Sequence, residues 1–92
     1  IGPYNSNAAK ISMPELNEAG LVQISPAVTW PGLTKKIKGV APDEPEKYRP
    51  SKKVTFCRVC TTDDLQGPLA ADFAVEELKA KKVYILDDKE LY

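Results

Sequence analysis

The chain has 92 residues, with 13 basic and 13 acidic side chains, no histidine and two cysteines. Because the charges cancel and no block of like charge occurs, nothing indicates a nucleic-acid-binding protein. The absence of histidine excludes Ser-His and Cys-His catalytic pairs and removes the commonest metal ligand. The sequence also lacks a run of about 18 apolar residues that would cross a membrane. These properties fit one small domain with a modest core.

The first quarter of the sequence predicts a helix followed by a short strand. Residues 7–19 carry apolar side chains at helical spacing, with Asn7 as the expected N-cap and Gly20 as the residue that stops the helix. Pro14 is expected to kink this helix, because proline removes a backbone hydrogen bond. The run LVQIS, residues 21–25, then predicts a short buried strand.

Residues 30–53 differ in composition from the segments on either side. They contain four prolines, two glycines and many charges of both signs. Such a composition is typical of a long surface loop rather than of a helix or strand. We therefore expect this segment to be a solvated loop that does not pack.

The remaining sequence predicts a strand, a helix and a further strand. Residues 54–60 are rich in β-branched side chains, and Asp63 or Asp64 is expected to cap the helix that follows. The apolar stripe of that helix comprises Ala70, Phe73, Ala74 and Leu78. Residues 83–86 are almost uniformly apolar, as in a parallel strand covered on both faces. This order of elements predicts an α/β fold with a parallel sheet flanked by helices.

Cys57 and Cys60 have the C-x-x-C spacing of redox and zinc motifs. In a strand, three steps of about 3.3 Å would separate their Cα atoms by about 10 Å, whereas a disulfide needs less than about 7 Å. The sequence has no further Cys or His to complete a tetrahedral metal site. Two strand cysteines are the preferred interpretation, and a small thiol redox module that uses Cys57 and Cys60 stays open as an alternative.

Small and polar residues occur where a parallel sheet would bind a ligand, beyond the carboxyl ends of strands. They form three stretches, residues 2–7 (GPYNSN), 25–30 (SPAVTW) and 87–92 (DDKELY). Ser6 and Thr29 are hydroxyl donors beside backbone amides, and a helix N-terminus favours an anion such as a carboxylate. A helix cap at Ser6 and a turn at Thr29 explain the same residues, so composition leaves both interpretations open.

The chain contains four successive blocks, GPYNSNAA, NEAGLVQISPAVTWPGLT, FCRVCTTDDLQGP and AKKVYILDDKELY. In this order and spacing they resemble the N-terminal lobe of type I periplasmic binding proteins, in particular the branched-chain amino acid receptors of ABC importers. The resemblance is weakest over residues 35–53, where this subgroup carries a variable Pro-rich loop. It implies that residues 1–92 form an incomplete lobe of Rossmann or flavodoxin-like type, with residues 30–53 as the variable loop.

The resemblance also implies a ligand site. In that family, residues at the positions of Ser6 and Thr29 hold the ligand carboxylate with side chains and amides. A main-chain carbonyl at Ala27 takes the ammonium group, and a tyrosine at the position of Tyr92 packs over the ligand. The further residues implied at the mouth of the site are Tyr4, Asn5 and Val28.

The implied function is that of a non-enzymatic solute-binding component, without cofactor or metal. It would bind a branched-chain amino acid or a related small carboxylate or amide and serve the membrane permease of an ABC importer. The implied location is periplasmic or extracellular, with a lipoprotein anchor left open. Because such receptors have two lobes, we expect the chain to be a fragment that self-associates through exposed apolar surface. A ligand-sensing receptor domain without transport remains a second alternative.

Overall fold

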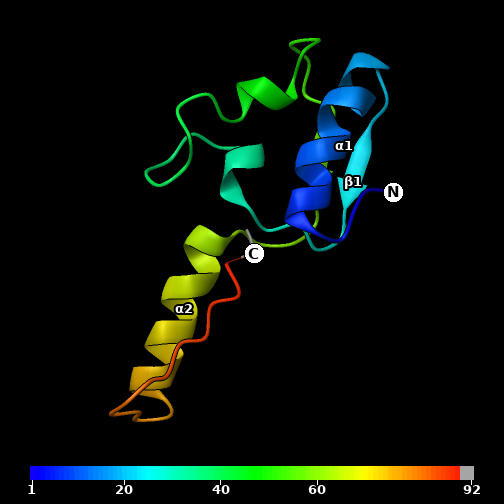
Figure 1. Cartoon of the computed structure of the whole chain (residues 1–92). Helices are drawn as coiled ribbons and strands as arrows, with labels where there is room; N and C mark the ends of the chain where they lie inside the picture. Colours follow the sequence, from blue (N-terminus) through cyan, green and yellow to red (C-terminus); the bar gives the residue numbers. More distant parts are fainter. Residues whose placement is uncertain (90–92) are drawn as a thin grey trace.

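The computed structural model describes residues 1–89 and has α-helical and parallel β-structure (Figure 1). In chain order the elements are α1 (Ser6–Glu18), β1 (Gln23–Ser25), the 3-10 turns η1 (Pro31–Leu33) and η2 (Glu46–Tyr48), β2 (Phe56–Arg58) and α2 (Asp63–Glu76). β1 and β2 pair in parallel, with Ile24 opposite Cys57. The described part of the chain is thus a small α/β unit, and both strands are shorter than predicted. Tyr92 lies outside the described residues.

Helix α1 begins at Ser6, and its N-cap is Asn5 rather than the predicted Asn7. The backbone of Asn5 is extended, so its side chain reaches forward and accepts hydrogen bonds from the amides of Asn7 (2.8 Å) and Ala8 (3.3 Å). The sequence offers three consecutive residues that make good caps, and only their backbone conformation selects among them. Because Asn5 is the N-cap, the Ser6 side chain does not cap the helix.

Helix α1 ends at the predicted stop. Gly20 has a φ of +71°, a conformation that glycine adopts without steric cost. Its N–H donates to the carbonyl of Asn17 (3.1 Å), and the N–H of Leu21 donates to the carbonyl of Leu16 (2.8 Å). This pair of bonds is a Schellman motif, which satisfies the last carbonyls of the helix. Pro14 is accommodated inside a helix that remains continuous.

The core lies where α1, the strands and residues 30–53 meet. Its members are Ala9, Met13, Val28, Leu33, Tyr48 and Phe56. Leu33 and Tyr48 belong to residues 30–53, and η1 is buried throughout. The prediction of a solvated loop was therefore wrong for this part of the segment. Proline and glycine indicate that a segment is irregular, but they do not indicate whether its leucine and tyrosine side chains find a core.

A buried amide fastens α1 to the chain that enters β2. Asn17 is 1 % exposed, and its Nδ2 donates to the carbonyl of Lys53 (2.9 Å) and to Oγ1 of Thr55 (2.7 Å). Its Oδ1 accepts from the backbone N–H of Ser51 (2.9 Å) and from the Ser51 hydroxyl (2.7 Å). A single side chain thus satisfies four polar groups of a segment that has no regular structure of its own.

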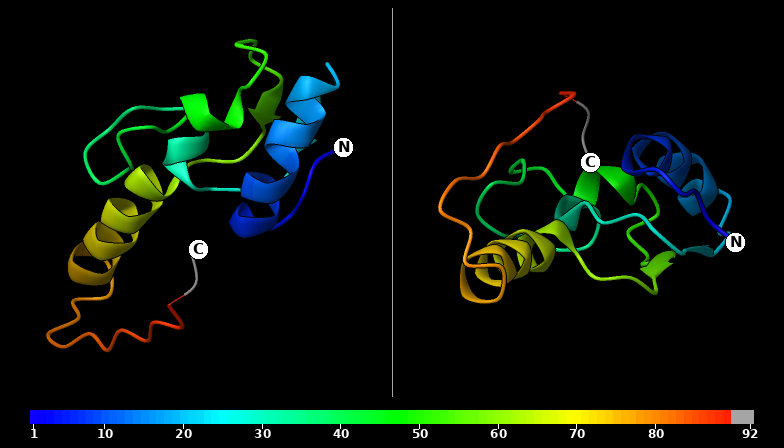
Figure 2. Two further views of the ribbon diagram at one scale, coloured as in Figure 1. Left: turned by 45° about the horizontal axis from the view of Figure 1, so that its top comes forward. Right: turned by 90° about the horizontal axis from the view of Figure 1, so that it is seen from below.

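The C-terminal part projects away from the rest of the chain (Figures 1 and 2). The radius of gyration is 15.4 Å, whereas a compact chain of this length would have about 12 Å. None of the residues of α2 is buried. Residues 83–86 are extended but exposed and unpaired, so the predicted last strand is absent from the described structure. An extended segment becomes a strand only when a neighbour supplies hydrogen bonds and cover.

Helix α2 differs from its prediction at the cap and along its apolar stripe. Its N-cap is Thr62, and Asp63 and Asp64 follow in the first turn, where their charge complements the helix dipole. Phe73 and Leu78 of the predicted stripe are 55 % and 65 % exposed. Within residues 1–89 no helix is both long and apolar enough to span a membrane.

Candidate functional site

A small pocket opens where the chain enters α1. It has a volume of about 130 Å³ and is lined by Tyr4, Asn5, Ser6 and Ala27. All four residues are among those that the sequence implicates in ligand binding, and they come from two separate segments. The N-terminal stretch meets the turn after β1 there, because the N–H of Gly2 donates to the carbonyl of Ile24.

Ser25, the last residue of β1, shapes the turn that carries Ala27. Its hydroxyl is fully buried and donates to the carbonyl of Pro3 (2.7 Å). The same oxygen accepts from the backbone N–H groups of Ala27 (3.2 Å) and Val28 (2.9 Å). The strand therefore ends in a side-chain-to-backbone turn rather than in further pairing. Sequence reasoning missed this role, although a serine directly before Pro26 is a turn signal.

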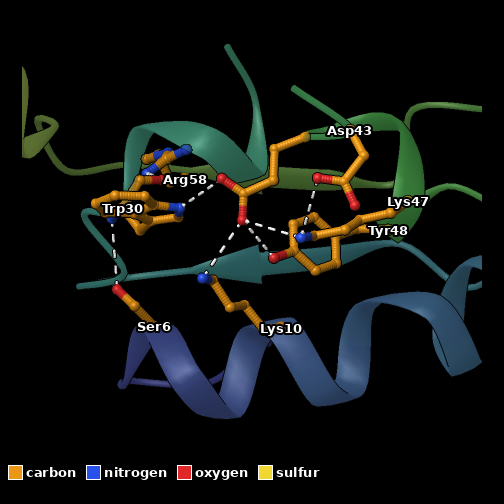
Figure 3. Close-up of polar contacts among 8 residues, drawn as sticks. Ser6, Lys10, Trp30, Asp43, Lys47, Tyr48 and Arg58 are labelled. Carbon is orange, nitrogen blue, oxygen red and sulfur yellow. Dashed lines mark hydrogen bonds and ion pairs between the residues drawn. The ribbon is translucent and has the colours of Figure 1, made fainter. Parts of the chain in front are cut away.

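Ser6 lies between the pocket and the turn after β1. It is 2 % exposed, and its Oγ accepts the backbone N–H of Trp30 at 3.4 Å (Figure 3). A hydroxyl carries one proton and two lone pairs, so this contact leaves the proton of Ser6 for an acceptor in the pocket. The amides of Asn7 and Ala8 are already taken by Asn5. The helix N-terminus thus offers a ligand fewer amides than the sequence suggested.

Thr29 has a buried hydroxyl in the turn that follows β1. It is 7 % exposed, and its Oγ1 has no hydrogen-bond partner within residues 1–89. A buried hydroxyl left unpaired costs about 1–3 kcal/mol, so it is a group that a ligand would satisfy. Thr29 is not one of the four residues lining the pocket. The structure brings it close to Ser6 through the next residue, since the N–H of Trp30 donates to Ser6.

The resemblance placed Val28 at the mouth of the ligand site, whereas the structure places its side chain in the core. It is fully buried and belongs to the hydrophobic core, so its side chain does not line the pocket. Its carbonyl accepts from Arg58 Nη1 (3.0 Å) and from Cys60 Sγ (3.4 Å). Within the stretch from Ala27 to Thr29, Ala27 lines the pocket, whereas the side chains of Val28 and Thr29 do not.

Arg58 holds the segment around Thr29 from the side of β2, a role that sequence reasoning missed. Its Nη1 donates to the carbonyl of Trp30 (2.9 Å) as well as to that of Val28, and its Nη2 donates to Oγ1 of Thr34 (2.5 Å). Burial lowers the pKa of Arg58 from its usual value, yet a guanidinium stays charged at neutral pH. The two carbonyls that flank Thr29 are therefore bound by one cation.

Glu44 is the third residue whose role sequence reasoning missed. Its side chain is 2 % exposed, and its carboxylate accepts the indole N–H of Trp30 (3.0 Å) and the hydroxyl of Tyr48 (2.6 Å). Nζ of Lys10 lies 3.3 Å from Oε1. Burial raises the pKa of Glu44, but these hydrogen bonds and the charge of Lys10 outweigh it, so the pKa lies below the usual 4.5. Nothing in the sequence distinguishes Glu44 from the other acidic residues of the segment.

The two cysteines are free thiols. Cys57 lies on β2 and is exposed, and Cys60 follows the strand and is half-buried. Among residues 1–89, no group of three or more cysteine, histidine or carboxylate side chains is placed to hold a metal ion.

Two curated relatives match the whole chain, whereas no family model and no solved structure does. This chain is 31 % identical over 93 aligned residues to an amino acid binding protein of Pseudomonas aeruginosa. It is 30 % identical over 92 residues to a Leu/Ile/Val-binding protein of Rhizobium johnstonii. In both cases the chain spans only 21 % of the length of the relative. The predicted resemblance is confirmed: this chain is similar, over its whole length, to about one fifth of an amino acid-binding protein.

Proposed function

We propose that this chain is part of a solute-binding protein and contributes to a site for an amino acid of the Leu/Ile/Val kind. The observation that carries the proposal is the pocket at the start of α1, which joins Tyr4, Asn5, Ser6 and Ala27. Both relatives are named as binding proteins, which supports a role in binding rather than in catalysis.

In the proposed complex, the ligand carboxylate accepts a hydrogen bond from the Ser6 hydroxyl and lies toward the Thr29 hydroxyl, which has no partner within residues 1–89. Because the Thr29 oxygen is covered, the turn from Ala27 to Trp30 must shift slightly for direct contact. The carbonyl of Ala27 accepts from the ligand ammonium. The pocket of about 130 Å³ is below the roughly 300–1,000 Å³ of complete small-molecule sites, so it takes only the amino acid headgroup.

The expected affinity of the isolated chain is low. A hydrogen bond to a charged group contributes about 1.5–3 kcal/mol, and capture of the ligand costs about 4–15 kcal/mol in lost freedom. Two or three such bonds therefore give dissociation constants on the order of millimolar or weaker. Measurable binding at that level is enough to test the site.

For the whole protein, we propose that the chain belongs to the N-terminal lobe of a two-lobed receptor that closes over its ligand. Residues 1–92 would form part of a Rossmann-like lobe with a variable Pro-rich segment at 30–53. Tyr92, outside the described residues, would pack over the ligand. Such a receptor would work in the periplasm or outside the cell and serve the permease of an ABC importer. The names of the two relatives support a binding role, and the share of their length that this chain covers supports its being part of a longer protein.

The test is a titration of the 92-residue chain with L-leucine, followed by NMR because weak binding is expected. Ser6→Ala and Thr29→Val should each weaken binding by on the order of tenfold, as loss of one hydrogen bond to a charged group predicts. Thr61→Val, which removes an exposed hydroxyl near β2, is the matched control and should bind as the unmodified chain does. L-leucinamide lacks the charged carboxylate and should bind the unmodified chain more weakly than L-leucine does. Equal affinities of all variants for L-leucine would refute the proposed carboxylate site.

A further inference from the structure

The single tryptophan of the chain is fixed through every polar group it has. The backbone N–H of Trp30 donates to Ser6 Oγ (3.4 Å), and its carbonyl accepts from Arg58 Nη1 (2.9 Å). Its indole Nε1–H donates to Glu44 Oε2 (3.0 Å). Since Trp30 follows Thr29 directly, the orientation of this residue decides where the Thr29 main chain lies relative to Ser6.

The Glu44 carboxylate is held beside the Trp30 indole by hydrogen bonds and ion pairs to four side chains. We call this set the Glu44 cluster; it consists of Lys10, Trp30, Glu44, Lys47 and Tyr48 (Figure 3). The cluster joins α1, the residue after Thr29 and η2, three segments that are distant in the sequence. A buried carboxylate is stable only while its partners stay in place, so the cluster fixes the spacing of these segments.

Gly32 provides the space that the cluster needs. A Cβ atom at this position would lie 2.0 Å from Oε2 of Glu44 and 2.6 Å from Nε1 of Trp30. Gly32 is not among the described glycines with a positive φ, so its lack of a side chain serves the close approach of the carboxylate to the indole. The Glu44–Trp30 hydrogen bond therefore requires glycine at position 32 as well as the two residues that form it.

We propose that Glu44 is a positioning residue for the candidate amino acid site. By binding the indole of Trp30, it holds the link from Thr29 to Trp30 against Ser6, while Arg58 binds the carbonyl of Trp30. A residue of the Pro-rich segment would then set ligand affinity without touching the ligand. The effect on affinity rests on the proposed function, whereas the effect on Trp30 does not.

Two variants disturb the contact by different means. Glu44→Gln keeps the size of the side chain but offers an oxygen on one side only, so it cannot accept from both Trp30 and Tyr48 through separate oxygens. Gly32→Ala keeps every charge and intrudes on the hydrogen bond sterically. Glu46→Gln is the matched control, because Glu46 lies in the same segment, is 59 % exposed and pairs with Lys36 at 3.1 Å.

The experiment records the indole and backbone amide NMR signals of Trp30 in each folded variant and then titrates each with L-leucine. We expect both Trp30 signals and the Thr29 amide to shift in Glu44→Gln and Gly32→Ala but not in Glu46→Gln. L-leucine affinity should fall by on the order of tenfold in the first two variants. If Glu44→Gln does not fold, Trp30→Phe removes only the indole donor and should shift the Thr29 amide in the same direction.

The outcomes separate the two proposals. A shift of the indole signal without any shift of the backbone amides of Thr29 and Trp30 would overturn the positioning role. The same holds if the amides shift but L-leucine affinity is unchanged. If all the signals shift as expected and the unmodified chain binds no L-leucine, Glu44 does position this segment and the proposed function is wrong.

Discussion

Two regions of this molecule, the body (residues 1–62) and the arm (residues 63–89), contain helices of similar length but differ in what surrounds them. In the body, α1 buries Ala9 and Met13 against a shared core. In the arm, α2 buries nothing, and its apolar side chains are exposed. Both segments are helical, so the presence of a helix does not show that one of its faces is buried; burial depends on partners far away in the sequence. The expectation that the chain self-associates through exposed apolar surface stays a prediction.

Equal truncations in the two regions should give the largest contrast. Leu33 is fully buried and Leu69 is 71 % exposed. Leu33→Ala should lower the free energy of unfolding by about 2–5 kcal/mol, because it removes buried surface and leaves a cavity. Leu69→Ala should change it by no more than about 0.5 kcal/mol. Urea denaturation monitored by Trp30 fluorescence measures both, and similar losses would mean that the arm packs on the body in solution.

The buried amide of the body should produce the next largest effect. Asn17→Ala removes the hydrogen bonds to the carbonyl of Lys53 and the amide of Ser51 and should lower the free energy of unfolding by about 1–3 kcal/mol in total. The neighbouring Glu18→Ala, at an exposed position, is the control and should be nearly neutral. Thermal unfolding followed by circular dichroism compares the two. A neutral Asn17→Ala would show that this connection does not stabilise the body.

Removal of the unpaired hydroxyl in the body should be stabilising. Thr29→Val puts a methyl group of similar shape in place of a buried Oγ1 that has no hydrogen-bond partner within residues 1–89. The free energy of unfolding should rise by about 1 kcal/mol, because the unpaired hydroxyl is no longer buried. The same variant should weaken L-leucine binding, which is the trade-off expected of a functional residue. A destabilised Thr29→Val would indicate that the hydroxyl already has a structural partner.

The smallest predicted effect is a pH dependence that comes from Glu44 in the body. The pKa of Glu44 is below its usual 4.5, so this carboxylate stabilises the folded state above that pH and loses its contribution as the pH falls through the lowered value. The stability difference between the unmodified chain and Glu44→Gln should therefore shrink as the pH falls from about 6 to about 3. Urea midpoints across this range measure it. A constant difference would show that folding does not lower the pKa of Glu44.

Local sequence patterns predicted helix α1, its end and the two paired strands. The periodicity of α1 and the glycine after it predicted the helix and its end, and β-branched runs predicted the two strands that pair in parallel. The expected meeting of Tyr4, Asn5 and Ser6 with Ala27 also occurs, because the N-terminal stretch pairs with β1. Their role in binding stays a proposal.

Long-range contacts decided what the sequence could not reveal. Residues 83–86 have the composition of a covered strand, but no strand lies beside them within residues 1–89. Glu44 and Arg58 resemble any other surface charge in the sequence, and only the folded chain shows that they bind Trp30 from two sides. Their importance follows from burial, which depends on tertiary packing rather than on local pattern.

The central claim is that the body, not the arm, binds an amino acid headgroup. The arm has the larger hollow, about 550 Å³ along α2, lined in part by Leu69 and Phe73. An NMR titration of the uniformly labelled chain with L-leucine compares the two places directly. We predict saturable shifts at Ser6, Ala27 and Thr29 and none along α2. Shifts confined to α2, or no saturable shifts at all, would contradict the claim.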